Sequence, residues 1–380
     1  MNTFREPVVR ARRCFADKVA VIDGDLRFTF AQLADRVDRV GAALSALGAS
    51  AGDRVAVLAE NSHQYIEIYL GAPAAGMVFA PLNSRLSLAE LEAICADCTP
   101  KLLFTDRSAE ELGNIPALVG RLLRLGAEFE SLLEAAAAIV SDRRPEEDST
   151  AVLLYTGGTT GRGKGVMLSH RNKLSDALSV ITSVGLVEQD RWLVFSPMFH
   201  SSGTFSLLPS IWVGATTVVQ PRFDPALVLK AVEAEQITIT FGVPTMLVSL
   251  VGQLREKEVD TSSLRLLGHG AAPITPTQLG AVCETLPHTE IMGMYGATEM
   301  APMATTFSHQ ELEVGTGRFA SCGRPVLGVE LAVVDDAGDQ VPTGVVGEIC
   351  VRGPNVMRGY WNLPSETAEA LAGGWYHSGD

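Results

Sequence analysis

Charged residues are scarce in this chain of 380 residues, where they make up 19% of the composition. Acidic residues outnumber basic ones by 44 to 30, so the net charge is −14. This balance argues against a nucleic-acid-binding surface, because phosphate backbones are held by clusters of Lys and Arg. Small anionic ligands are not excluded, since one loop can be positive within an acidic protein. We therefore expect small-molecule partners and no nucleic acid.

Cysteine is also sparse, with six residues scattered along the chain. Only Cys95 and Cys98 are close in sequence, in a stretch with helical periodicity and without a histidine or a second pair nearby. Such a pair is more typical of a buried or helix-end position than of a redox or zinc site. Nothing implies a disulfide framework, and residues 1–17 have no long apolar run typical of a signal peptide, so we expect a reducing, cytoplasmic location.

Two segments lack charge altogether: Trp192–Pro221, with thirty residues, and Ile237–Leu254, with eighteen. Either could span a bilayer by length alone. The first contains Pro197, His200 and Pro209, and the second has Pro244 after a β-branched run. These breaks favour buried strands and helices inside an α/β domain, so we expect no integral membrane segment.

Short apolar strands alternate with amphipathic helices over most of the chain, which predicts an α/β fold. We expect layered αβαβα subdomains with mostly parallel sheets. From about residue 321 the sequence changes to short β-like segments separated by turns, which predicts a small antiparallel β-barrel-like unit. The expected boundaries are 1–150, 151–320 and 321–380. The expected strands are Arg54–Leu58, Gly76–Phe79, Lys101–Thr105, Trp192–Phe195, Thr216–Gln220, Thr238–Phe241 and Leu264–Gly268. The expected helices are Thr29–Leu47, His63–Ala74, Leu88–Cys98, Leu118–Asp142, Asp224–Glu235 and Thr277–Thr285.

The segment Tyr155–Val166 reads YTGGTTGRGKGV and is flanked by apolar, strand-like residues. Its five glycines let backbone N–H groups approach a ligand closely, and consecutive exposed N–H groups form an anion nest. Threonine hydroxyls, Arg162 and Lys164 add donors and positive charge. A plain surface loop and a Walker A loop are the alternatives. The Walker pattern needs Ser or Thr at position 165, where this chain has Gly.

Four further motifs follow the loop in a fixed order, and together the five resemble the adenylate-forming superfamily of acyl-CoA synthetases, adenylation domains and luciferases. The resemblance covers essentially the whole chain. One such motif is weak evidence, whereas five in order are strong. The motifs after the loop are Pro197-Met198-Phe199-His200, Gly270-Ala271-Ala272-Pro273, Tyr295-Gly296-Ala297-Thr298-Glu299 and Gly374-Trp375-Tyr376-His377-Ser378-Gly379-Asp380.

The resemblance implies an ATP and Mg²⁺ site. By it, Thr298 hydrogen-bonds the α-phosphate, Glu299 holds Mg²⁺ together with Thr159, and Asp380 accepts the ribose hydroxyls. Residues that embrace the phosphates are Thr156, Gly158, Thr159, Thr160, Gly161 and Lys164. Residues that contact adenine or lie against it are Gly270, Ala271, Ala272, Tyr295 and Gly296. Two departures, Gly157 for the usual Ser or Thr and Gly163 for the usual Pro, predict a looser loop.

The resemblance places His200 at the acyl pocket, although a lone histidine in an apolar stretch is more often a core residue. The stretch Phe199–Phe205 has no acid that could bind an amino group, and Met198, Phe199, Phe205 and Met294 suggest an apolar fatty or aryl acid. Asp224 stays open as an amino-group ligand. By itself the Thr298-Glu299 pair could equally be a cap at a strand end.

The implied reaction is attack of a carboxylate on ATP to form an acyl-adenylate, followed by thioester formation with coenzyme A. The catalytic candidates are Lys164, His200, Thr298 and Glu299. The family normally continues past the last motif into a C-terminal lid domain with a further lysine; we expect that domain to be missing here and adenylation to be weak. An amino-acid adenylation domain serving a carrier protein and a non-catalytic nucleotide-binding module remain alternatives. A homodimer is compatible with the sequence.

Overall fold

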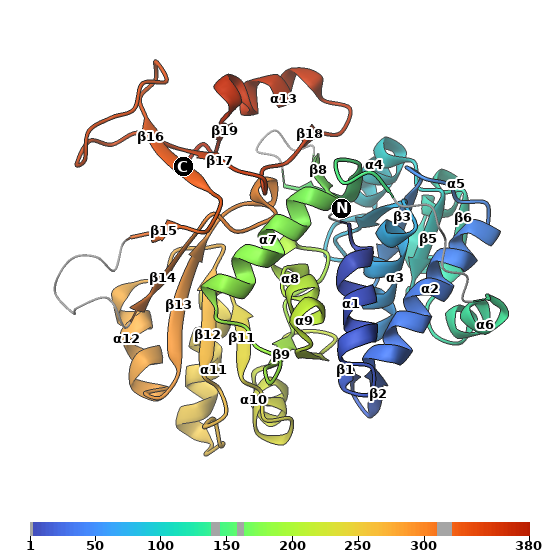
Figure 1. Cartoon of the computed structure of the whole chain (residues 1–380), viewed down its shortest axis with the longest axis horizontal. Coiled ribbons are helices and arrows are strands. Elements are labelled where there is room, and N and C mark those ends of the chain that lie inside the picture. Colours follow the sequence, from blue (N-terminus) through green and yellow to red (C-terminus); the bar gives the residue numbers. More distant parts are fainter. Residues whose placement is uncertain (1–2, 138–144, 158–162, 310–320) are drawn as a thin grey trace.

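The computed structural model describes residues 3–137, 145–157, 163–309 and 321–380 (Figure 1). The first large sheet has seven strands in the order β18-β8-β7-β4-β3-β5-β6. Its central strands run parallel, while β8 pairs antiparallel with both β7 and β18. The bounds are β3 Arg54–Leu58, β4 Val78–Pro81, β5 Leu102–Thr105, β6 Arg121–Arg124, β7 Thr150–Thr156, β8 Lys164–Ser169 and β18 Gly359–Tyr360.

The second large sheet has nine strands in the order β15-β14-β13-β12-β11-β9-β10-β1-β2. Strands β13, β12, β11, β9, β10 and β1 run parallel to one another, and antiparallel strands complete both edges. The bounds are β1 Val19–Asp23, β2 Leu26–Thr29, β9 Arg191–Val194, β10 Thr216–Val219, β11 Ile239–Gly242, β12 Leu266–Gly270, β13 Glu290–Tyr295, β14 Thr305–Ser308 and β15 Arg324–Pro325.

A small third sheet of three antiparallel strands lies near the C-terminal end of the chain (Figure 1). Its strands are β16 Glu330–Val334, β17 Glu348–Arg352 and β19 Tyr376–His377. Helix α13, Pro364–Ala370, precedes β19. The last residue, Asp380, hydrogen-bonds through its carbonyl to the N–H of Ile349, so the end of the chain is fixed against β17.

Five layers result from how the helices cover the two large sheets. Buried side chains of α2 (Phe30–Ala46), α3 (His63–Ala74) and α7 (His170–Ser183) share one hydrophobic cluster with strands of both sheets. A second cluster covers the outer face of the nine-stranded sheet with α10 (Pro225–Ala234), α11 (Pro244–Glu256) and α12 (Pro276–Thr285). A third packs α4 (Leu88–Cys98) and α5 (Ile115–Leu118) on the outer face of the seven-stranded sheet. The expected αβαβα layering is confirmed.

Local sequence signals fix several helix starts. Thr29, Ser87, Ser169 and Thr275 form capping boxes with the residue three positions later, so two backbone N–H donors at each of these ends are satisfied by side-chain oxygens. The remaining helices are α1 Arg5–Cys14, α6 Ala127–Ala135, α8 Ser201–Thr204 and α9 Leu207–Val213. In the described part of the chain, no helix is both long and apolar enough to cross a bilayer.

Two local expectations need correction. The expected single helix over Leu118–Asp142 is wrong, because Arg121–Arg124 forms strand β6. Of the described residues after this strand, up to residue 137, Ala127–Ala135 is helical. Strand β6 pairs in parallel with β5, so sheet pairing overrides a composition that favours helix. The hairpin of β1 and β2 was not expected, and it extends the second sheet with residues from the start of the chain. The three-part division at residues 150 and 320 stays a prediction.

Candidate functional site

The glycine-threonine segment links two antiparallel strands, β7 and β8. Thr156 and Lys164 are opposite each other at the last pair of the ladder, and the Thr156 hydroxyl donates to the Lys164 carbonyl at 3.4 Å. Gly163 would place a Cβ 3.1 Å from the Thr156 carbonyl oxygen, so the strand ends approach closely. Of the expected phosphate ligands, Gly158, Thr159, Thr160 and Gly161 lie outside the described residues.

The motif that begins at Tyr295 follows strand β13 and turns sharply. A Cβ on Gly296 would lie 1.9 Å from the Pro302 carbonyl oxygen, so only glycine fits this turn. Thr298–Met300 then forms one 3-10 turn. The Asn355 side-chain amide donates to the carbonyls of Met300 and Met303 at 2.9 Å each, which holds the end of the turn and the segment that follows it.

Glu299 is 8% exposed and its carboxylate has a specific donor. The Tyr360 hydroxyl donates to Oε1 at 2.9 Å, and the Met357 N–H donates to the Glu299 carbonyl at 2.7 Å. Burial and the nearby Glu299 charge raise the pKa of Tyr360, so its phenol stays a donor. The Lys164 ammonium lies 4.9 Å from the centre of the Tyr360 ring. Tyr360 therefore connects the expected phosphate-loop cation with the expected metal-ligating carboxylate.

Sequence reasoning missed Tyr360, and it missed two buried charges on α7. Lys173 donates from Nζ to the Ala301 carbonyl at 2.8 Å, and Asp176 accepts from the Met303 N–H at 3.0 Å. Burial lowers the pKa of Lys173 and raises that of Asp176, while the charge of each opposes the shift of the other. Two opposite charges three residues apart, on the same face of α7 as the apolar Ala177 and Val180, were the signal that could have found them.

The expected adenine and ribose residues meet where β12 and β13 end. Gly270 pairs with Met294, and a Cβ on Gly270 would lie 2.3 Å from the Met294 carbonyl oxygen. Ala271 follows with a φ of 61°, a left-handed conformation that turns the chain away from the strand. The Tyr295 hydroxyl donates to the Asp380 carboxylate at 2.8 Å. Ala272, next in the chain, is exposed.

Two cavities meet at His200, Ser201 and Thr298. The first, of about 340 Å³, has apolar walls from Phe205, Phe241 and Met294, and a polar side from the turn at Tyr295-Gly296 and from Ala271. The Ser201 and Thr298 hydroxyls are 3.4 Å apart.

The second cavity, of about 600 Å³, extends from the same junction to Thr156, Gly157 and Gly163, and along α4. One continuous site thus joins the glycine-threonine hairpin to the motif at Tyr295.

His200 is not a core residue, so the simplest expectation from its apolar neighbours is wrong. Its side chain is exposed to both cavities, and its ring centre lies 4.5 Å from that of Phe199. The cavity walls surround it closely enough that desolvation lowers the pKa of His200, with a smaller contribution from the Arg85 charge. A neutral imidazole at the junction can donate or accept a hydrogen bond.

A family model described as AMP-binding enzyme matches residues 8–361, which is most of the chain. The chain belongs to the AMP-binding enzyme family. A feruloyl-CoA synthase of Amycolatopsis sp is 38% identical over 98% of this chain and 74% of its own length. A 2-succinylbenzoate–CoA ligase of Bacillus licheniformis is 32% identical over 96% of this chain and 73% of its own.

Among solved structures, the N-terminal domain of FACL13 from Mycobacterium tuberculosis superposes on this AMP-binding enzyme with a TM-score of 0.93. It is 27% identical and covers 100% of this chain and 96% of the other. The family and the α/β layering expected from the motifs are therefore confirmed. The chain spans about three quarters of the length of the first curated relatives.

Proposed function

We propose that this AMP-binding enzyme activates an apolar carboxylic acid with ATP and transfers the acyl group to coenzyme A. The observation that carries the proposal is the junction of the two cavities at His200, Ser201 and Thr298. One cavity leads to the phosphate hairpin and the other is lined by apolar side chains. A carboxylate and the α-phosphate of ATP can approach each other only where such cavities meet. The relatives, which are CoA ligases and synthases of several acids, support the reaction class.

In this proposal the nucleotide lies across the ends of β12 and β13. Tyr295 stacks on adenine beside the backbone of Gly270, Ala271 and Gly296. Asp380 accepts the ribose hydroxyls, which suits a carboxylate with two acceptor oxygens. Thr298 donates to the α-phosphate. Thr156 and Lys164 contact the outer phosphates at the mouth of the hairpin.

Mg²⁺ fits the residues around Glu299. A hard cation takes carboxylate oxygen ligands and keeps phosphate oxygens as further ligands, and Glu299 offers a carboxylate whose orientation Tyr360 fixes. Bound there, the ion would neutralise charge on the phosphates. The expected second ligand, Thr159, lies outside the described residues.

The chain itself contributes positioning and charge neutralisation rather than covalent chemistry. The substrate carboxylate attacks the α-phosphorus, pyrophosphate leaves, and an acyl-adenylate forms. The thiol of coenzyme A then attacks the acyl carbon, loses its proton and releases AMP. His200 orients the carboxylate from the junction, and Lys164 with Thr298 holds the phosphate oxygens against it. The glycine turn at Gly296 excludes side-chain bulk from this space.

The apolar cavity favours fatty or aryl acids over amino acids. Among the described residues that line it, none is acidic, so the cavity offers no carboxylate to an α-amino group. Asp224, which was left open as such a ligand, instead caps α10 by accepting from the N–H groups of Ala226 and Leu227. An amino-acid adenylation domain is therefore the weaker candidate.

Acid-dependent pyrophosphate release tests the proposal. It should be measured with aryl, fatty and amino acids, on this chain and on protein extended to the length of the relatives. We expect release with an aryl or fatty acid, and a loss of about 10²-fold or more in Glu299→Gln and Thr298→Ala. Glu284→Gln, on the exposed face of α12, is the matched control and should leave the rate unchanged. ATP hydrolysis without any acid, or release with amino acids alone, would contradict the proposal.

We also propose a cytoplasmic location. All six cysteines are free thiols, which supports a reducing, cytoplasmic compartment. A homodimer stays a prediction, and the molar mass from light scattering would test it.

A further inference from the structure

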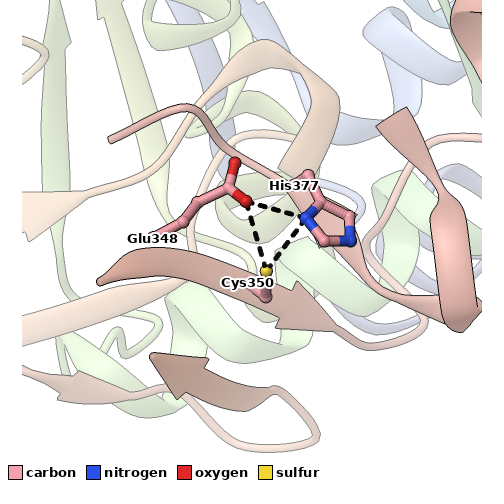
Figure 2. Close-up of side chains that lie close together, drawn as sticks. All are labelled: Glu348, Cys350 and His377. Atoms are coloured by element: carbon pink, nitrogen blue, oxygen red, sulfur yellow. Dashed lines mark hydrogen bonds and ion pairs between the residues drawn. The ribbon is translucent and has the colours of Figure 1, made fainter. Parts of the chain in front are cut away.

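A cluster of three metal-binding side-chain types lies in the small third sheet, apart from the two cavities. Glu348 and Cys350 come from β17, and His377 comes from β19 (Figure 2). The two strands are antiparallel, and Cys350 is the direct partner of His377 in the ladder. Residues that pair across two strands have side chains on the same face. The sheet register therefore holds the thiol and the imidazole together without help from a loop.

The spacing of the three ligand atoms matches one metal ion. His377 Nδ1 lies 2.8 Å from Glu348 Oε2 and 3.4 Å from Cys350 Sγ, and Sγ lies 3.9 Å from Oε2 (Figure 2). Zinc bonds of about 2.0–2.3 Å in a tetrahedron place neighbouring ligand atoms about 3.3–3.7 Å apart. Changes of about half an ångström in each pair would satisfy that geometry, and these are within the reach of side-chain rotation.

The surroundings resemble a prepared site. The Gly379 N–H donates to Glu348 Oε1 at 2.9 Å, which fixes the carboxylate while its other oxygen faces the thiol and the imidazole. Such a second partner orients a ligating group and is a common feature of metal sites. Cys350 is 1% exposed, whereas about a third of the Glu348 and His377 side chains reaches solvent. An ion can enter from that open side, and the fourth position can hold water.

We propose that Glu348, Cys350 and His377 together bind one Zn²⁺ ion, at a site distinct from the Mg²⁺ position at Glu299. A thiolate, an imidazole nitrogen and a carboxylate suit Zn²⁺ and not Mg²⁺, which prefers oxygen ligands alone. On binding, the Cys350 thiol releases its proton to solvent and forms the Zn–S bond. His377 binds through Nδ1, and its ring proton is carried on Nε2.

The pH dependence of zinc binding follows from the thiol ligand. Zinc binds the thiolate, whereas an ordinary cysteine thiol is protonated at neutral pH, so one proton is displaced on binding. Zinc affinity should therefore rise with pH over the neutral range, by up to tenfold per unit.

The ion would also fix the segment that ends in Asp380. Residues His377 to Asp380 are held to β17 by the hydrogen bonds from Gly379 to Glu348 and from Ile349 to the Asp380 carbonyl. A metal that bridges Glu348, Cys350 and His377 joins the same two strands by three more bonds. The thermal midpoint of the protein should therefore rise when Zn²⁺ is added.

Cobalt substitution tests the proposal directly. The chain, stripped with a chelator and kept reduced, is titrated with Co²⁺, whose thiolate complexes have a charge-transfer band in the near ultraviolet. We expect one Co²⁺ per chain with this band, its loss on adding one equivalent of Zn²⁺, and no loss with excess Mg²⁺. Cys350→Ser and His377→Gln should each remove the band or weaken affinity by about tenfold or more.

Cys283→Ser, at an exposed thiol of α12, is the matched control and should keep the band. Far-ultraviolet circular dichroism of each metal-free variant checks that it folds. Glu348→Gln, which keeps an acceptor for Gly379, provides a second, milder variant, and its affinity should fall while its fold is kept. A wild-type chain without the band, or a Cys350→Ser variant that keeps it at full intensity, would overturn the proposal.

Discussion

Tyr360 offers the sharpest test of how the site is held together, because one atom can be removed while the ring stays in place. Tyr360→Phe deletes the hydroxyl that donates to Glu299 Oε1 at 2.9 Å. It keeps the ring above which Lys164 lies at 4.9 Å. Tyr360 is 7% exposed and Glu299 is 8% exposed, so water replaces the lost donor poorly. The substitution removes this hydrogen bond to a carboxylate, and with it the hydrogen bond that Tyr376 donates to the same hydroxyl.

The magnitude follows from the charge and the burial of this pair. A hydrogen bond to a charged group contributes about 1.5–3 kcal/mol. We expect the free energy of unfolding to fall by about 2 kcal/mol in Tyr360→Phe, which is about a 30-fold change in the unfolding equilibrium. If Glu299 holds Mg²⁺, the loss should shrink in the presence of Mg²⁺ and ATP, because the ion then stabilises the same carboxylate.

Urea denaturation at pH 7, followed by both tryptophan fluorescence and circular dichroism, measures this loss. A double-mutant cycle with Glu299→Ala shows how much of the loss comes from the hydrogen bond to Glu299, since the hydroxyl then has no carboxylate to which it can donate. We expect Tyr360→Phe to cost at least about 1 kcal/mol less in the Glu299→Ala background. Equal costs in both backgrounds would refute the reasoning and would assign the effect to packing of the ring.

Three further outcomes follow from the geometry. Burial lowers the pKa of His170, His269 and His309 to about 4, so between pH 6.5 and 4 the unfolded state binds protons that the folded state excludes. The urea midpoint should therefore fall as the pH is lowered through this window, and the fall should be smaller in His170→Asn. In Gly296→Ala the added Cβ would lie 1.9 Å from a carbonyl oxygen, which should lower the free energy of unfolding by about 1–3 kcal/mol and the thermal midpoint with it. Gly280→Ala, with open space in α12, should be neutral or stabilising. Asp176→Ala should cost about 3–5 kcal/mol in urea unfolding by leaving the Lys173 ammonium buried without its nearby carboxylate, and Lys173→Met in the same chain should recover part of that loss.

Much of the fold was accessible from periodicity because most of its strands are central and several of its longer helices begin with a capping side chain. Ser62 and Ser87 stand directly before the expected helices His63–Ala74 and Leu88–Cys98 and cap them. The cap that Asp224 forms on α10 was not predicted. The errors fall at the edges of the sheets. Strands β6 and β2 are edge strands, and β1 joins the second sheet only through β10, which lies far along the chain. The sheet context of these strands is therefore not visible in a local pattern.

The structure brings together site candidates that occur in compact motifs, whereas the residues that support them come from elsewhere in the chain and were missed. Tyr295, Thr298 and Asp380 meet at the cavities or beside them, as the motifs implied. Tyr360 is 61 residues from Glu299, and Lys173 is 128 residues from Ala301. Contacts of this range depend on how the sheets pack, which single-residue patterns do not encode.

The pairing of β1 with β10 sets an order in time for a chain that is made from its N-terminus. Val21 lies beside Thr217, so 196 residues separate two neighbouring positions in one sheet. At about 5–20 residues per second, the ribosome needs roughly 10–40 s to make that stretch. Through this interval the hairpin of β1 and β2 has no strand to join, and its apolar Val19–Asp23 edge is available to other chains. Pairing between nascent chains on neighbouring ribosomes of one message would therefore be most favoured before Thr217 leaves the ribosome.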